Sequence, residues 1–158
     1  MASLSPTRLS LKRRTRPERL ELGFGVYVIC KPLGQLHIDT AEARAKAIAR
    51  EMARSADNIA DYALEAAEIS ELFSPEDPDL LIGSGMLLLS VELAMMGVVG
   101  WGGFDDENGN PIDDKDVNRR DLSMLFQARV PETDLSFAQV FFSLATRQAF
   151  LETAEKKD

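Results

Sequence analysis

The sequence predicts a mainly α-helical protein with a small β element, folded as a single-domain helical bundle. Alanine-rich and apolar stretches that repeat about every 3.6 residues indicate the helices. Alternating apolar residues near position 20 and a glycine-rich corner near Trp101 indicate the β element. A chain of 158 residues can bury a substantial core. We therefore expect residues 18–158 to form one helical domain after a disordered arm at residues 1–17.

The predicted arm is basic, whereas the rest of the chain is acidic. Residues 1–19 hold six basic side chains against Glu18, a net charge of +5, so the remainder carries −13 of the total of −8. A basic arm of this kind is usually disordered and solvated, although it could also contact an acidic surface, including phosphate. The acidic remainder argues against nucleic acid as the main partner.

The first ordered element is expected at residues 20–32, where apolar side chains alternate with a period of two. The residues predicted to share one face are Leu20, Leu22, Phe24, Val26, Val28 and Cys30. Gly23 and Gly25 make the element either a hairpin or a bulged strand. Cys30 is the only cysteine, so it cannot form an internal disulfide and is expected to be a small buried side chain.

A long helix should follow, capped by Asp39 with Glu42 three residues later. Its sequence is rich in alanine and contains no glycine or proline from residue 40 to residue 55. It continues to about residue 73 or breaks near residues 56–57. Ala41, Ala45, Ile48 and Met52 lie on one stripe of this helix.

Residues 80–97 are apolar on almost every side, with Glu92 as the only charge. Glycines, serines and Glu92 favour the central buried helix of a bundle over a membrane span. We expect Glu92 to reach the edge of the core or to pair with an arginine of the preceding helix.

The corner at residues 98–112 should hold a short strand, a tight reversal and a return at Ile112 opposite Val99 or Trp101. Asn108-Gly109 accepts positive φ angles easily, which predicts a hairpin turn of the primed type. The residues expected to shape this corner structurally are Trp101, Gly103, Gly109 and Pro111.

Two helices complete the prediction. Asp113 and Asp114 are expected to cap a helix at residues 115–128, and Thr133-Asp134 to cap a last helix at residues 135–155. The last helix has a wide aromatic stripe, which is either deep core or core plus a partner site. The candidate partner-binding residues are Phe141, Phe142, Phe150, Ala45, Ile48 and Met52. Because the stripe is wider than one core-facing side, we also expect the protein to be a homo-oligomer.

No constellation of catalytic, cofactor-binding or metal-ligating residues is recognisable. His37 and Cys30 are the only residues of their types, too few for a usual zinc site in a monomer. Aligned on Gly109, a calcium loop would place Phe104 and Lys115 at its two acidic end positions. The sequence therefore predicts no enzyme, cofactor, metal or small-molecule substrate.

The corner reads VVGWGGFDDENGNPI from Val98 to Ile112. It resembles the segment of tailed-phage tail assembly chaperones in which W-x-G-V is followed by D-E-x-G-x-P. The order of an alanine-rich helix, an apolar helix, the segment and a helical C-terminus is also similar, from about residue 20 to residue 157. Phe104 stands where valine is commoner, which keeps an apolar side chain.

This resemblance implies a non-enzymatic chaperone in the cytoplasm of the bacterial host, encoded by a phage, prophage or phage-derived particle. Such a protein binds the tape measure protein, keeps its long helix soluble and helps recruit tail tube subunits. The alternative is a structural component of the neck or tail whose basic arm docks on a neighbouring subunit. Neither hypothesis includes a membrane.

Overall fold

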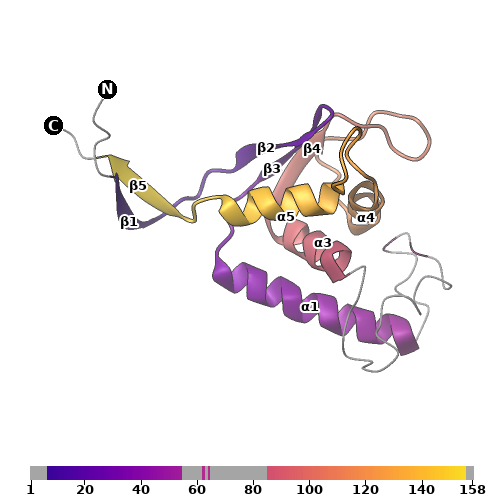
Figure 1. Ribbon diagram of the computed structural model, residues 1–158, viewed down its shortest axis with the longest axis horizontal. Helices are drawn as coiled ribbons and strands as arrows, with labels where there is room; N and C mark the ends of the chain where they lie inside the picture. The colour runs from indigo at the N-terminus through magenta and orange to yellow at the C-terminus, as the bar shows by residue number, and fades with distance from the viewer. Residues whose placement is uncertain (1–6, 55–61, 63, 65–84, 156–158) are drawn as a thin grey trace.

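The computed structural model describes residues 7–54, 62, 64 and 85–155, and within them the protein has an α+β fold. Four helices and five strands lie in these ranges, and the strands form two antiparallel sheets (Figure 1). The predicted mainly helical bundle is therefore wrong. The elements are β1 (Thr7–Arg13), β2 (Glu18–Gly23), β3 (Val26–Cys30), α1 (Gln35–Arg54), α3 (Gly85–Gly97), β4 (Val98–Gly102), α4 (Arg119–Gln127), α5 (Phe137–Arg147) and β5 (Leu151–Glu155).

The larger sheet has the strand order β2–β3–β4, and its inner face lines the core. Leu22, Val26, Val28 and Cys30 are buried at period two, as the alternation predicts. The hairpin alternative for residues 20–32 is the one realised. Phe24, however, lies at the tip and is exposed, because Phe24 and Gly25 both have positive φ angles and form the two-residue turn.

Helix α3 is the centre of the helical layer and contacts α1, α4 and α5 (Figure 1). Its residues Leu88, Val91, Leu93 and Ala94 are fully buried, so the expectation of a central buried helix is confirmed for residues 85–97. Residues 80–84 lie outside the described ranges. In the part of the chain that the structure describes, no helix is long and apolar enough to cross a membrane.

Helix α1 begins at Gln35, one turn before the predicted cap Asp39. The carbonyl oxygen of Gly34 accepts hydrogen bonds from the backbone N–H groups of His37 and Ile38, which starts the helix earlier. Asp39 accepts instead from the side chain of Gln35, at 2.9 Å. The predicted continuation to about residue 73 falls almost entirely outside the described residues.

The second sheet is a two-stranded ribbon of β1 and β5 that extends from the body and ends near both chain termini (Figure 1). It corrects two expectations. Residues 7–13 of the predicted disordered arm form strand β1. The last helix ends at Arg147, and Leu151–Glu155 form strand β5, which pairs with β1. Because the two strands are far apart in the sequence, local composition could not reveal their pairing. Residues 1–6 and 156–158 are not described.

The caps of α4 and α5 also differ from the predicted ones. Asn118 caps α4, and Ser136 caps α5 in a capping box with Gln139. Asp113 and Asp114 cannot start a helix because their carbonyl oxygens accept from the indole Nε1 and the backbone N–H of Trp101, at 3.0 and 3.2 Å.

The corner after β4 is built around the fully buried Trp101, whose ring packs edge-on against Phe104 at 5.1 Å. The turn is not of the predicted primed type, because Gly109 has a φ of 80° but Asn108 does not have a positive φ. Asp106 and Asn110 close a three-residue loop, and Asp105 bridges to Pro111. Ile112 consequently pairs with Phe104, at 3.1 Å, rather than with Val99 or Trp101.

Candidate partner-binding cleft

The partner-binding face expected on α5 and α1 is not an exposed surface. Phe141, Ala45 and Met52 are buried in the core, and Phe142 and Ile48 are half-buried against it. The aromatic stripe is wide because α5 packs against several elements at once, namely α3, α4 and β2. Phe141, for example, stacks on Phe126 of α4 with 5.2 Å between ring centroids.

Phe150 does not belong to α5 and contacts a different part of the molecule. It lies in the link between α5 and β5, where its ring meets the edge of His37 at 6.0 Å and the guanidinium of Arg13 at 5.5 Å. Its backbone oxygen accepts from the N–H of Arg14, at 3.0 Å. Phe150 therefore joins the ribbon to the body and does not extend the stripe of α5.

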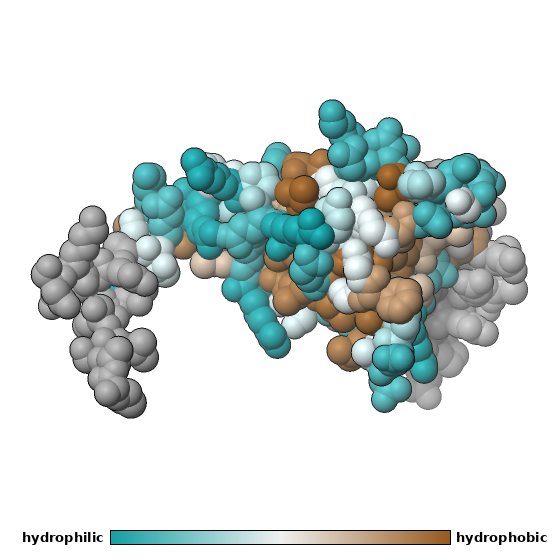
Figure 2. Space-filling model, turned by 90° about the horizontal axis from the view of Figure 1, so that it is seen from above, coloured by the Kyte–Doolittle hydropathy of each residue, from teal (hydrophilic) through white to brown (hydrophobic). Residues whose placement is uncertain are grey.

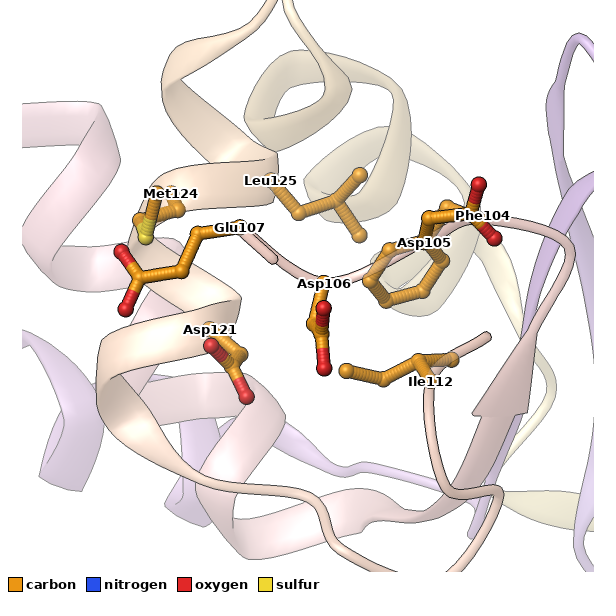
Figure 3. A pocket seen from close by; sticks show the side chains of 8 residues that line it. All are labelled: Phe104, Asp105, Asp106, Glu107, Ile112, Asp121, Met124 and Leu125. Atoms are coloured by element: carbon orange, nitrogen blue, oxygen red, sulfur yellow. The ribbon is translucent and has the colours of Figure 1, made fainter. Parts of the chain in front are cut away.

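A hollow of about 240 Å³ lies between the loop after Trp101 and helix α4. Figure 3 shows its lining, with the apolar side chains of Phe104, Ile112 and Leu125 on its floor. The carboxylates of Asp106, Glu107 and Asp121 lie around it, whereas that of Asp105 points away. Met124 completes the lining and is 37% exposed. We call this hollow the acidic cleft.

The wall of the acidic cleft that the loop after Trp101 forms is held by contacts within the loop and with the β2–β3 hairpin. The carboxylate of Asp106 accepts from the backbone N–H groups of Asn108 and Asn110, at 2.9 and 3.0 Å, which fixes the loop. Gly103 has a φ of 86°, and a side chain there would collide with the backbone of Gly25. Phe104 is thereby directed onto Trp101 and into the cleft.

The opposite wall is anchored by an ion pair in the interior. Arg119, at the start of α4, bonds the carboxylate of Glu92 on α3 through Nε and Nη2, at 3.0 and 3.1 Å. The hydroxyl of Tyr62 also donates to Glu92, and the carbonyl oxygen of Tyr62 accepts from Ser123 of α4. The arginine partner of Glu92 thus comes from a later helix and not from the preceding one.

The pKa values of Arg119 and Tyr62 are both raised, which keeps both side chains in the protonated forms that bond Glu92. The hydrogen bond to Glu92 raises the pKa of Arg119, so the guanidinium stays charged. Burial, and then the hydrogen bond to Glu92, raises the pKa of Tyr62, so its hydroxyl stays protonated. The network fixes α4 on α3 and lies behind the cleft.

The apolar floor and the acidic rim of the cleft together suit an amphipathic partner segment that carries basic side chains. The rim is partly neutralised, since Arg120 pairs with Glu107 at 3.2 Å and Asn118 donates to Asp121 at 2.9 Å. The carboxylates do not converge as metal ligands: among the described residues, no group of three His, Cys, Asp or Glu side chains could hold a metal ion. The chemistry available here is the binding of apolar and cationic groups.

Phe24 is an exposed aromatic residue at the tip of the β2–β3 hairpin, whereas the alternation of the sequence predicted that it shares one strand face with Leu22 and Val26. It is 76% exposed and has a φ of 52°, at the tip that packs against Gly103. A bulky residue with positive φ is unfavourable by about 1–3 kcal/mol, and such residues concentrate at functional positions. The signal in the sequence was the Gly-Phe-Gly triplet, which marks a turn rather than a strand.

Comparison of the chain with family models, curated proteins and solved structures finds no match in any of the three.

Proposed function

We propose that this protein is a non-enzymatic tail assembly chaperone of a tailed phage, a prophage or a phage-derived particle. In this role it binds the tape measure protein in the bacterial cytoplasm and helps recruit tail tube subunits. The observation that carries the proposal is the acidic cleft, since residues 104–107 and Ile112, which belong to the segment that resembles the chaperone motif, form one of its walls.

The cleft offers what a helix-binding chaperone needs. Its floor of Phe104, Ile112 and Leu125 can bury the apolar side chains of an amphipathic helix. Its carboxylates attract lysine or arginine on the flanks of the same helix. Phe24, which is 76% exposed at the tip of the β2–β3 hairpin, is a further large apolar group that a partner can contact.

The test is a pull-down of the tape measure protein with a pair of matched variants. Met124 in the cleft and Met86 on α3 are each 37% exposed. We expect Met124→Lys to reduce capture of the tape measure protein about tenfold or more, because it places a cation in the lining of the cleft and repels a basic partner. We expect Met86→Lys, which makes the same change away from the cleft, to bind as the wild type does.

Equal capture by both variants would contradict this assignment of the site. The alternative function, a structural component of the neck or tail, is separated by mass spectrometry of purified particles. A chaperone should be absent from finished particles, and a structural component should be present in a fixed ratio.

A further inference from the structure

The ribbon of β1 and β5 has a surface that does not suit a free-standing element. Leu11 is 86% exposed, and Leu9 is also exposed. A two-stranded antiparallel ribbon is at best marginally stable alone in water, and both of its strands have an open edge. Leu9 and Leu11 are two residues apart in one strand, so they form a small apolar patch that a second surface can cover.

Basic side chains predominate where the ribbon joins the body, so an acidic surface would suit it. The hollow where β1 runs into β2 is lined by Lys12, Arg13, Arg14 and Arg16, with one acidic residue, Glu152. Lys12 approaches Glu152 at 3.9 Å, and Arg14 pairs with Glu18, so part of this charge is compensated. Figure 2 shows that the ribbon end is mostly hydrophilic, whereas hydrophobic residues gather on the body.

The acidic cleft has the complementary properties, but it lies at the other end of the molecule. Its apolar floor could receive a leucine, and its carboxylates could face the ribbon's cations. The ribbon is at one end of the long axis, and α4, which forms a wall of the cleft, is at the other (Figure 1). A ribbon therefore cannot reach the cleft of its own chain.

We propose that the β1–β5 ribbon of one copy docks in the acidic cleft of a second copy. Leu9 or Leu11 lies on the floor formed by Phe104, Ile112 and Leu125, and the basic residues of the ribbon face Asp106, Glu107 and Asp121. Since each copy has one ribbon and one cleft, the contact either closes into a pair or ring, or extends as a chain.

This inference does not depend on the tape measure protein, although both proposals use the acidic cleft. Self-association and partner binding are then competitive. Because the ribbon covers the cleft only between copies, a partner helix that enters the cleft dissociates the assembly.

The test is the mass of the purified full chain, measured by light scattering, with two defective variants and their mixture. Leu11→Glu damages the ribbon, and Met124→Lys damages the cleft. We expect the wild type to be a dimer or larger in about 0.1 M salt and to dissociate in about 1 M salt, where charges are screened within about 3 Å. Each variant alone should be a monomer.

An equal mixture of the two variants should form a complex of two subunits, because one intact ribbon then meets one intact cleft. The matched controls are Leu36→Glu, at a position that is 77% exposed on α1, and Met86→Lys. Both should keep the wild-type mass. Circular dichroism of every variant shows whether it remains folded.

A monomeric wild type, defective variants that keep the wild-type mass, or a mixture that stays monomeric would each overturn the proposal. The outcome is also separable from that of the chaperone proposal. Leu11→Glu should lose self-association yet still capture the tape measure protein, whereas Met124→Lys should lose both.

Discussion

Glu92 and Arg119 form a bidentate ion pair that joins α3 to α4. The side chain of Glu92 is 1% exposed and that of Arg119 is 42% exposed. The charge of Glu92 is thus compensated inside the core, and Tyr62 donates a further hydrogen bond to it. The pair holds the wall of the acidic cleft in place. A change that breaks this ion pair is therefore expected both to lower the stability of the core and to disturb the acidic cleft.

Removing Arg119 should destabilise the protein more than removing its neighbour Arg120. Arg119→Ala leaves the buried carboxylate of Glu92 without its cation, which we expect to cost about 2–3 kcal/mol, less than a fully buried pair because Arg119 is partly solvated. Arg120→Ala, which affects the exposed pair with Glu107, should cost about 0–1 kcal/mol. Urea unfolding measures both values, and similar losses would contradict a structural role for the buried pair.

Trp101→Ala should lower the free energy of unfolding by about 3–5 kcal/mol, since it leaves a large cavity and removes the hydrogen bond to Asp113. Trp101 is the only tryptophan, so its fluorescence reports on this site alone. The native emission should be blue-shifted and poorly accessible to iodide. Red-shifted, fully quenched emission would show that the corner is open to solvent.

Phe24→Asn should stabilise the fold by about 1 kcal/mol, because asparagine tolerates the positive φ and Asn-Gly suits this turn. The same variant should bind the tape measure protein more weakly, because the exposed ring is lost. Glu132, with a φ of 66°, is the matched position. Glu132→Asn should bring a similar gain in unfolding midpoint without changing the binding. If Phe24→Asn binds normally, the ring has no role in recognition.

Stability should fall at alkaline pH partly because of Cys30. Burial raises the pKa of its thiol from 9.0 to about 12. The thiol's contribution is complete below about pH 9, where both states are protonated. As the pH rises from 9 towards 12, only the unfolded chain loses the proton, so stability decreases by at most about 1.4 kcal/mol per pH unit. Tyr62, whose pKa is also raised, acts in the same direction.

The measurement is urea unfolding at about pH 8 and about pH 10.5 for the wild type and for Cys30→Ala. We expect a smaller loss between the two pH values in the variant, whatever its absolute stability. An equal loss in both proteins would show that other groups account for the pH dependence.

Elements with a local sequence pattern could be predicted from the residues alone. The alternation from Leu20 to Cys30, the almost wholly apolar run that becomes α3 and the glycines around Trp101 are each visible within one short stretch of sequence, and the structure contains all three features. The burial of Trp101 follows from the same signal.

Features that depend on residues far apart in the sequence could not be predicted and became visible only in the folded chain. Residues 7–13 and 151–155 are a polar arm and a helix end by composition, but each supplies the backbone hydrogen bonds that the other needs as a strand. Phe141 and Phe142 lie on a helix with several packing neighbours, so a stripe too wide for one core face is buried at Phe141 and half-buried at Phe142. The acidic cleft forms only where the Trp101 corner meets α4, a meeting set by Glu92 and Arg119 across 27 positions of sequence.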